Sequence, residues 1–215
     1  MAEQSDYFDK VAQTVVECDK DACLRLLEEG IDIDPLETLE KGLGKGIKQI
    51  GDDFGTGKVF LPELIGAADV MKAGVAVLDE RIKASGKARQ SQGKIVIGTV
   101  KGDIHDLGKS VVASMLQANG YDVVDLGIDV EDAEFVKMAQ EHEADCVGMS
   151  TLLTLTIENM GVVIQKFKDA GMRDQVKVIV GGAPVTQEFA DEIGADAFGY
   201  DASDAVKKVK ALLGK

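Results

Sequence analysis

The sequence predicts an α/β domain with a parallel sheet, preceded by a separate bundle of helices. From residue 94 onward, short β-branched runs alternate with helical patterns, which is typical of a doubly wound parallel sheet. Before residue 85, apolar residues recur at helical spacing. Between these halves, residues 85–93 contain two glycines and no large apolar side chain, which favours a linker.

Residues 1–84 are expected to form a four-helix bundle. One helix start is clear at Asp34–Glu37, where an N-cap aspartate, a proline at the first helical position and a glutamate at N3 coincide. The helix that follows has an apolar stripe on one face and ends in a glycine-rich turn at residues 55–57. Pro62 then opens the longest helix, whose apolar residues follow a seven-residue repeat that suits a packed bundle. Two shorter helices before Gly30 would complete the four.

Residues 94–215 are expected to form a five-stranded sheet of the Rossmann-like (flavodoxin-like) kind. The predicted strands are IVIGTV, DVVDLG, DCVGMS, KVIVGG and AFGY, and helical patterns separate them. Right-handed crossovers place helices on both faces of such a sheet. The loops that follow its strands share one edge, and this edge is where open α/β sheets bind ligands.

The composition excludes several classes of function. The net charge of −14 argues against a nucleic-acid partner, which needs clustered Lys and Arg, and against an anionic membrane surface. No apolar run approaches the ~20 residues that a membrane span needs, and the polar, acidic N-terminus is not that of a secretion signal. The three cysteines include no CxxC pair, so we expect reduced thiols in a cytoplasmic protein.

The loop after the first predicted strand carries the strongest chemical signal. It holds Asp103, His105 and Asp106, and the chain has only two histidines. Gly108-Lys109-Ser110 is similar to the end of a Walker A motif. That motif needs a glycine at position 103, however, and the two aspartates would repel a phosphate. A second interpretation is a capping aspartate beside a solvated histidine.

A third interpretation treats His105 as a metal ligand and Asp103 as its orienting partner. A neutral imidazole binds a metal through one ring nitrogen while the other donates to a carboxylate, which fixes the tautomer. One histidine cannot build an all-protein metal site, because zinc sites need three or four protein ligands. It suffices for a metal whose other positions are already filled, as in a macrocycle. This interpretation predicts a cofactor that needs one axial base.

Two further motifs fall just past the third and fourth predicted strands. The motif D-x-H-x-x-G spans residues 103–108; after 41 intervening residues comes Ser150-Thr151-Leu152, and after 28 more comes Gly181-Gly182. This ordered triple resembles the cobalamin-binding domain of methionine synthase and of the corrinoid proteins of methyltransferase systems. Upstream, residues 57–64 and Met71-Lys72 are similar to the helical cap domain that precedes the corrinoid domain in those proteins.

The resemblance implies a role for each motif residue. His105 would be the lower ligand of cobalt in place of the nucleotide base (base-off, His-on), Asp103 would hold its other nitrogen, and Ser150 would extend that relay. Phe60 and Leu61 would be cap residues near the upper, methyl-bearing face. The remaining positions would contact the cofactor and its nucleotide tail, with glycines where the backbone must come close: Gly102, Ile104, Asp106, Gly108, Leu152, Gly181 and Gly182.

By size and motif order, the chain is similar to free-standing corrinoid proteins of the methanol, methylamine or methylated-betaine type. Such a protein is not catalytic alone. A substrate-specific methyltransferase would load a methyl group onto Co(I). A corrinoid:acceptor methyltransferase would then pass it from methyl-Co(III) to a thiol or to tetrahydrofolate. A reductive activation protein would be a third partner.

Two other cobalamin-binding classes share the motif pattern. An adenosylcobalamin mutase subunit would normally work with a barrel domain, and the predicted cap before the motif points away from this class. A cobalamin-sensing regulator has the same two modules but also needs a DNA-binding segment, which neither the N-terminus nor the charge supplies. A receiver-like interaction domain without cofactor does not explain the ordered triple.

Overall fold

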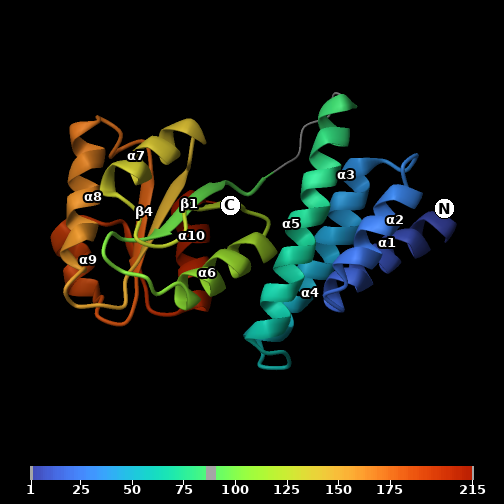
Figure 1. Ribbon diagram of the computed structural model, residues 1–215, viewed down its shortest axis with the longest axis horizontal. Coiled ribbons are helices and arrows are strands. Elements are labelled where there is room, and N and C mark those ends of the chain that lie inside the picture. Colours follow the sequence, from blue (N-terminus) through green and yellow to red (C-terminus); the bar gives the residue numbers. More distant parts are fainter. Residues whose placement is uncertain (1, 86–90, 215) are drawn as a thin grey trace. The chain divides into compact units, whose positions relative to one another are not determined.

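The computed structural model describes residues 2–85 and 91–214, and the chain divides into two compact units between Gln90 and Ser91 (Figure 1). Residues 86–90, which belong to the expected linker, lie outside the described residues. Within the described ranges, no helix combines the length and the apolar character that crossing a bilayer requires. Each unit buries its own set of apolar side chains.

The first unit is helical. Its elements are α1 (Ala2–Val16), α2 (Lys20–Glu29), α3 (Pro35–Glu37), the π-helical turn η1 (Thr38–Leu43), α4 (Gly44–Gly55) and α5 (Leu61–Ala84). The predicted helix start is confirmed, because the Asp34 carboxylate accepts the backbone N–H of Leu36 at 2.9 Å and Pro35 opens the helix. Helices α3, η1 and α4 follow one another without a break, so the described part of this unit is the predicted four-helix bundle.

The core of the bundle follows the seven-residue repeat of α5. Val75 is partly buried, and the other apolar positions of the repeat are buried: Leu64, Ala68, Met71, Leu78 and Ile82. Gly74 lies among them, and a Cβ atom there would be 2.5 Å from Cδ1 of Leu43. Glycine therefore lets α5 and η1 pack more closely than a side chain would allow.

The second unit is a five-stranded parallel sheet in the order β2-β1-β3-β4-β5, which confirms the predicted fold class. Its strands are β1 (Lys94–Thr99), β2 (Asp122–Asp125), β3 (Cys146–Ser150), β4 (Lys177–Gly181) and β5 (Ala197–Gly199). Its helices are α6 (Leu107–Ala118), α7 (Asp132–Glu141), α8 (Glu158–Asp169), α9 (Gln187–Ile193) and α10 (Ala202–Leu213). Helices cover both faces of the sheet (Figure 1).

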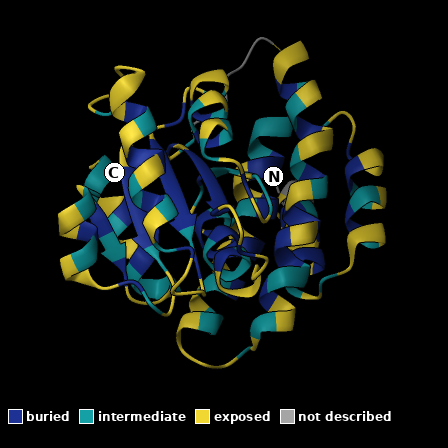
Figure 2. Ribbon diagram, turned by 60° about the vertical axis from the view of Figure 1, so that its left-hand side comes forward, coloured by how far each residue is buried: buried dark blue, intermediate teal, exposed yellow. Residues whose placement is uncertain are grey.

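The inner strands are the most deeply buried part of the α/β unit (Figure 2). Phe135 of α7 and Phe167 of α8 pack with Val96, Val147 and Val178 in one apolar cluster on a single face of the sheet. The chain runs from β1 outward to β2 and then returns to β3 on the other side of β1. The loops after β1 and β3 therefore diverge, and such a switch point is where open α/β sheets form ligand sites.

Candidate functional site

The strand register brings the three motifs to one edge of the sheet. Thr99 pairs with Ser150, Ser150 pairs with Gly181, and Gly181 pairs with Gly199. Strands β1, β3, β4 and β5 thus end at the same level. The loops that carry the D-x-H-x-x-G, S-x-L and glycine motifs leave the sheet side by side.

His105 lies in the loop between β1 and α6 with one ring nitrogen held by Asp103. Its Nδ1 atom is 2.7 Å from Asp103 Oδ1, and its backbone N–H donates to the same oxygen at 2.9 Å. The hydroxyl of Thr99 also donates to the carbonyl oxygen of His105 at 3.0 Å. Because an ionised carboxylate only accepts, Nδ1 carries the proton and the lone pair of Nε2 is available to a metal. The side chain is 46 % exposed, so an external group can reach it.

Asp103 is fully buried, and its second oxygen accepts hydrogen bonds from the loop after β3. Oδ2 accepts the backbone N–H groups of Leu152 at 2.6 Å and Leu153 at 3.1 Å. It also accepts the hydroxyl of Thr151 at 2.7 Å, and the hydroxyl of Thr156 lies 3.4 Å away. The carboxylate thus receives two contacts from its own loop and four from the loop after β3, and it joins the two loops.

These contacts keep Asp103 ionised. Burial by itself raises the pKa of the carboxyl group. Hydrogen bonds from the backbone of His105 and Leu152 and from the side chains of Thr151 and His105 outweigh burial and hold the pKa well below its usual range. Asp103 is thus a permanent acceptor for the imidazole at neutral pH, and such a partner raises the basicity of a metal ligand.

The hydroxyl that reaches Asp103 is that of Thr151, where the sequence had suggested Ser150. Successive side chains of a strand point to opposite faces. Ser150 shares a face with Gly148, and both line a cavity. Thr151 is one residue further along, is buried, and turns toward Asp103 and Thr156. The sequence signal that could have identified this position is the second hydroxyl directly after the strand.

The loop after β2 is also hydrogen-bonded to the loop that carries Asp103 and His105. Asp129 accepts the backbone N–H of Gly102 at 2.7 Å and donates its own backbone N–H to the carbonyl of Asp103 at 2.9 Å. Both Gly102 (φ 80°) and Asp129 (φ 52°) are in the left-handed region. Glycine adopts it freely, and aspartate does so more readily than most residues. Sequence reasoning did not single out Asp129.

The predicted glycine pair after β4 lies against the loop that holds Asp103. Gly182 has φ 130°, and a Cβ atom at this position would lie 1.8 Å from the carbonyl oxygen of Thr151. A Cβ at Gly181 would lie 3.0 Å from the carbonyl oxygen of Gly199 on β5. Only glycine therefore lets the β4 loop approach the β3 loop this closely.

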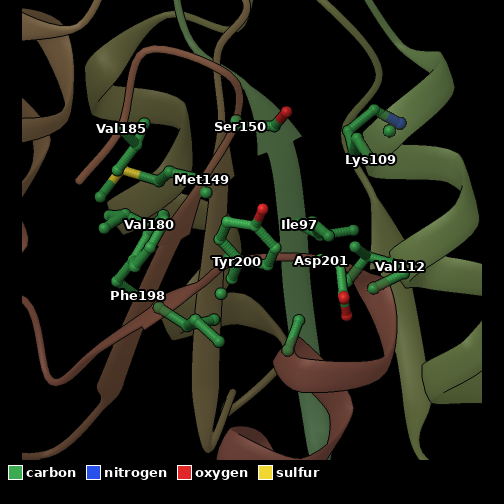
Figure 3. Close-up of a pocket in the computed structure, with 18 of the residues that line it drawn as sticks. Ile97, Lys109, Val112, Met149, Ser150, Val180, Val185, Phe198, Tyr200 and Asp201 are labelled. Carbon is green, nitrogen blue, oxygen red and sulfur yellow. The ribbon is translucent and has the colours of Figure 1, made fainter. Parts of the chain in front are cut away.

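A cavity of about 420 Å³ lies at the same edge, beside α6 and α10 (Figure 3). Its lining includes four predicted site residues: Gly108, Ser150, Gly181 and Gly182. The lining also includes seven larger apolar side chains: Ile97, Val112, Met149, Ile179, Val180, Val185 and Phe198. The volume is within the range of roughly 300–1,000 Å³ that is usual for small-molecule sites.

The other predicted site residues are exposed or partly buried. Ile104 is 69 % exposed and directly precedes His105 in the chain. Leu152 is 48 % exposed, and its backbone N–H donates to Asp103, the partner of His105. Both side chains therefore present apolar surface near His105. Asp106 is exposed directly before α6. In the helical unit, Phe60 is 72 % exposed and Leu61 is partly buried at the start of α5. The side chain of Phe60 therefore lies outside the bundle core.

In a comparison with known protein families, the two units match families that share one description. Residues 93–209 and residues 7–79 each match a family described as B12 binding domain. The chain is 45 % identical over 214 residues to dimethylamine corrinoid protein 2 of Methanosarcina acetivorans, covering 99 % of both chains. It is 43 % identical over 215 residues to trimethylamine corrinoid protein 2 of Methanosarcina mazei, again covering 99 % of both.

A solved structure is similar over nearly the whole chain. This is the methanol:cobalamin methyltransferase complex MtaBC from Methanosarcina barkeri. The match has a TM-score of 0.88 and 28 % identity and covers 97 % of this chain and 80 % of that one.

The residues of the α/β unit fit a corrinoid on two observations. A corrinoid brings four ring nitrogens to its cobalt and needs an axial base, and His105 offers one imidazole nitrogen while Asp103 holds the other. The cavity beside the glycine turns provides room for a nucleotide tail. The chain therefore belongs to the family of corrinoid proteins built on the B12 binding domain.

Proposed function

We propose that this protein is the methyl carrier of a multicomponent methyltransferase system whose methyl donor is a methylated amine. The observation that carries the proposal is the Asp103–His105 pair, an imidazole with one nitrogen held by a buried carboxylate and the other available. The names of the relatives support the donor class, because they are dimethylamine and trimethylamine corrinoid proteins. When bound, the corrinoid supplies the cobalt on which the methyl group travels between two partner enzymes.

His105 would hold the cobalt of the corrinoid, through its available nitrogen Nε2. Asp103 fixes the tautomer and the ring orientation, because its Oδ1 accepts both the ring and the backbone N–H. Thr151 and the backbone of Leu152 hold Oδ2, so the loop after β3 positions the loop after β1. Because Asp103 stays ionised, it stabilises positive charge on the imidazole, whether that charge comes from a metal or from a proton on Nε2.

The cofactor contacts extend beyond the axial ligand. Ser150, Gly181 and Gly182 face the cavity and would contact the nucleotide tail. Glycines at the turn let the backbone come close to a ligand. Ile104 and Leu152 would contact the ring system, since their exposed apolar side chains stand on the two loops joined by Asp103. Ser150 thus belongs to the tail cavity, and Thr151 takes the relay position.

The helical unit serves as a cap for the reactive face of the cofactor. Reduced cobalt is a strong nucleophile that oxidises easily, so a carrier needs a shield that opens to its partners. Phe60 supports this role, because a large aromatic side chain that is 72 % exposed at the start of a helix is available to cover an apolar ligand. Leu61 follows it directly.

Three partners follow from the carrier role. A donor methyltransferase loads the methyl group, and the similarity to the methanol:cobalamin methyltransferase complex supports such a partner. A corrinoid:acceptor methyltransferase removes the methyl group and passes it to a thiol or to tetrahydrofolate. A reductive activation protein restores cobalt that has been oxidised.

The decisive experiment identifies the nitrogen ligand of cobalt. Full-length protein is reconstituted with hydroxocobalamin, reduced to Co(II) and examined by electron paramagnetic resonance, with and without ¹⁵N-labelled histidine. In the labelled protein the superhyperfine splitting is expected to change from a ¹⁴N to a ¹⁵N pattern, because a histidine of the chain replaces the cofactor's own base. In labelled His105→Ala the ¹⁵N pattern should be lost. Labelled His142→Ala is the matched control, because His142 is the chain's other histidine and lies at the end of α7. A ¹⁵N pattern that persists in His105→Ala would refute the assignment.

A further inference from the structure

We propose that the cavity at the carboxyl edge of the sheet selects corrinoids by the lower base of their nucleotide tail. It would accept a tail that ends in an apolar aromatic base, of the phenol or benzimidazole type, and discriminate against a purine. The inference rests on the proposed function, because it requires the tail to enter this cavity. It names the class of corrinoid that the site takes.

The walls of the cavity are apolar on two opposite sides. In Figure 3, Ile97 and Val112 lie on one side of Tyr200, and Val180 and Phe198 lie on the other. Tyr200 itself is 82 % exposed, which places it at the mouth. A ring that enters between these walls exchanges water for aliphatic and aromatic contacts on both of its faces.

Small residues from the strands and α10 line the cavity between these walls. A Cβ atom at Gly199 would lie 2.9 Å from the Cβ of Ala205, and one at Gly148 would lie 3.1 Å from Cγ1 of Ile97. The backbone is therefore packed too closely there for a longer side chain. These positions therefore stay small, which leaves the cavity its volume of about 420 Å³.

Both charged residues of the lining have hydrogen-bond partners outside it, Lys109 through its ammonium group and Asp201 through one carboxylate oxygen, Oδ1. The ammonium group of Lys109 binds both carboxylate oxygens of Asp125, its side chain is 2 % exposed, and Figure 3 shows its nitrogen turned away from Tyr200. Asp201 accepts the backbone N–H of Asp204 at the start of α10. Among the described lining residues, the remaining polar side chains are the hydroxyls of Ser150 and Tyr200.

This inventory suits bases with few polar atoms. A phenol-type base linked through its oxygen brings no donor, and a benzimidazole released from cobalt brings one ring nitrogen, for which the Ser150 hydroxyl can supply a donor. Adenine brings an amino group and several ring nitrogens. Polar atoms that are buried without partners weaken binding, and the expected discrimination is roughly 10- to 100-fold.

The test measures equilibrium binding of intact cobamides to the full-length apoprotein. The matched pair is cresolyl cobamide and adeninyl cobamide. The cresol never coordinates cobalt and the adenine does so weakly. Detaching the base from the metal therefore costs little free energy for either cobamide. Cobinamide, which lacks the tail, gives the baseline, and cobalamin is measured alongside. The dissociation constant is read from the absorbance change on His105 ligation.

The expected result is that cresolyl cobamide binds at least about 10-fold more tightly than adeninyl cobamide and more tightly than cobinamide. A ratio below 10-fold between the two cobamides overturns the inference, as does equal binding of cresolyl cobamide and cobinamide. If none of the four compounds binds with a histidine signature, the proposed function fails. Equal binding of all four with that signature refutes only the selectivity.

A pair of variants ties the selectivity to this cavity. Ala202→Leu adds three carbon atoms to the lining and should remove at least about half of the affinity ratio between cresolyl cobamide and cobinamide. Ser203→Leu is the matched control, because Ser203 neighbours Ala202 on α10 but does not line the cavity. If Ala202→Leu keeps the wild-type affinity ratio between cresolyl cobamide and cobinamide, the tail does not enter this cavity and the inference is overturned.

Discussion

The Nδ1 atom of His105 lies 2.7 Å from Oδ1 of Asp103, a carboxylate with no solvent exposure. The second oxygen of that carboxylate is held by Thr151 and by the backbone of Leu152. The imidazole is therefore oriented before any ligand binds to its other nitrogen. Such preorganisation removes the cost of ordering the ligand at the moment of binding.

Replacing Asp103 by Asn should weaken axial ligation and leave the corrinoid bound. The amide keeps the shape but removes the charge that polarises His105, and partners of metal ligands are typically worth about 10–100-fold in affinity or activity. The measurements are the Co(II)/Co(I) midpoint potential and the methyl-transfer rate. Asp174→Asn, at an exposed position between α8 and β4 and outside the predicted site, is the control. Wild-type values for both quantities in Asp103→Asn would contradict the role of the pair.

Thr151→Val should destabilise the α/β unit and weaken ligation by His105. The substitution keeps the volume but removes the hydroxyl that donates to Asp103 at 2.7 Å, and hydrogen bonds to charged groups contribute about 1.5–3 kcal/mol. Urea unfolding of the apoprotein measures the loss. Thr154→Val, at an exposed position of the same loop, should change stability by less than about 0.5 kcal/mol. Equal effects of the two variants would remove Thr151 from the network.

Gly182→Ala should be among the most destabilising single substitutions at the site. A Cβ atom would lie 1.8 Å from the carbonyl oxygen of Thr151, and φ is 130°. Strain and overpacking each cost about 1–3 kcal/mol, so the expected loss in unfolding free energy is about 2 kcal/mol or more. Gly171→Ala separates the two causes, because Gly171 has φ 68° and open space around its Cβ position. If both variants lose the same amount, the close approach at Gly182 contributes nothing.

The pH dependence of stability should include a contribution from Cys146 on the alkaline side. Burial, with smaller contributions from Asp196 and Asp145, raises the pKa of this thiol to about 12. The unfolded chain loses the thiol proton near pH 8.5 while the folded chain keeps it. Unfolding thus releases a proton, and stability falls as pH rises above about 8.5, by up to about 1.4 kcal/mol per pH unit.

Denaturant unfolding between pH 8 and 10.5 measures this effect. Cys146→Ala should have lower stability at pH 8, because it leaves a cavity in β3, but a flatter dependence on pH. Cys18 and Cys23 are present in both proteins, so the difference in slope reports Cys146 alone. Parallel pH curves for wild type and variant would show that this thiol does not titrate on unfolding.

Residues 91–215 should bind cobalamin with His105 ligation but protect it less well than the full chain. These residues carry the loops after β1, β3 and β4, and about 125 residues suffice for an independent core. Without the helical unit, reduced cobalt should reoxidise faster and the methyl–cobalt bond should photolyse more readily. Phe60→Ala in the full chain should shift both rates part of the way, because it removes an exposed aromatic side chain. Equal rates for the full and shortened chains would mean that the helical unit is not a cap.

The spacing of residues in the sequence was enough to predict the helical bundle, the parallel sheet and the pairing of Asp103 with His105. Each of these depends on local pattern: a seven-residue repeat, the alternation of strands with helices, and two polar residues separated by one position in a short loop. The common edge of the three motifs follows from the same pattern, because parallel strands end together. Local sequence preferences and the final fold agree for such features, so the sequence is enough to predict them.

Tertiary structure alone decided which further groups complete the site. At the end of β3, strand alternation directs Ser150 to the cavity and leaves Thr151 to bond Asp103, and nothing in the S-x-L pattern distinguishes the two hydroxyls. Asp129 contacts Gly102 because β2 lies beside β1, although 27 positions separate them. The sequence marks Gly182 as a site glycine, but the carbonyl of Thr151 that excludes a side chain there lies on the loop after β3 and is seen only in the folded chain. These contacts join residues distant in the chain, so sequence spacing carries no signal for them, and only the packing of strands and loops creates them.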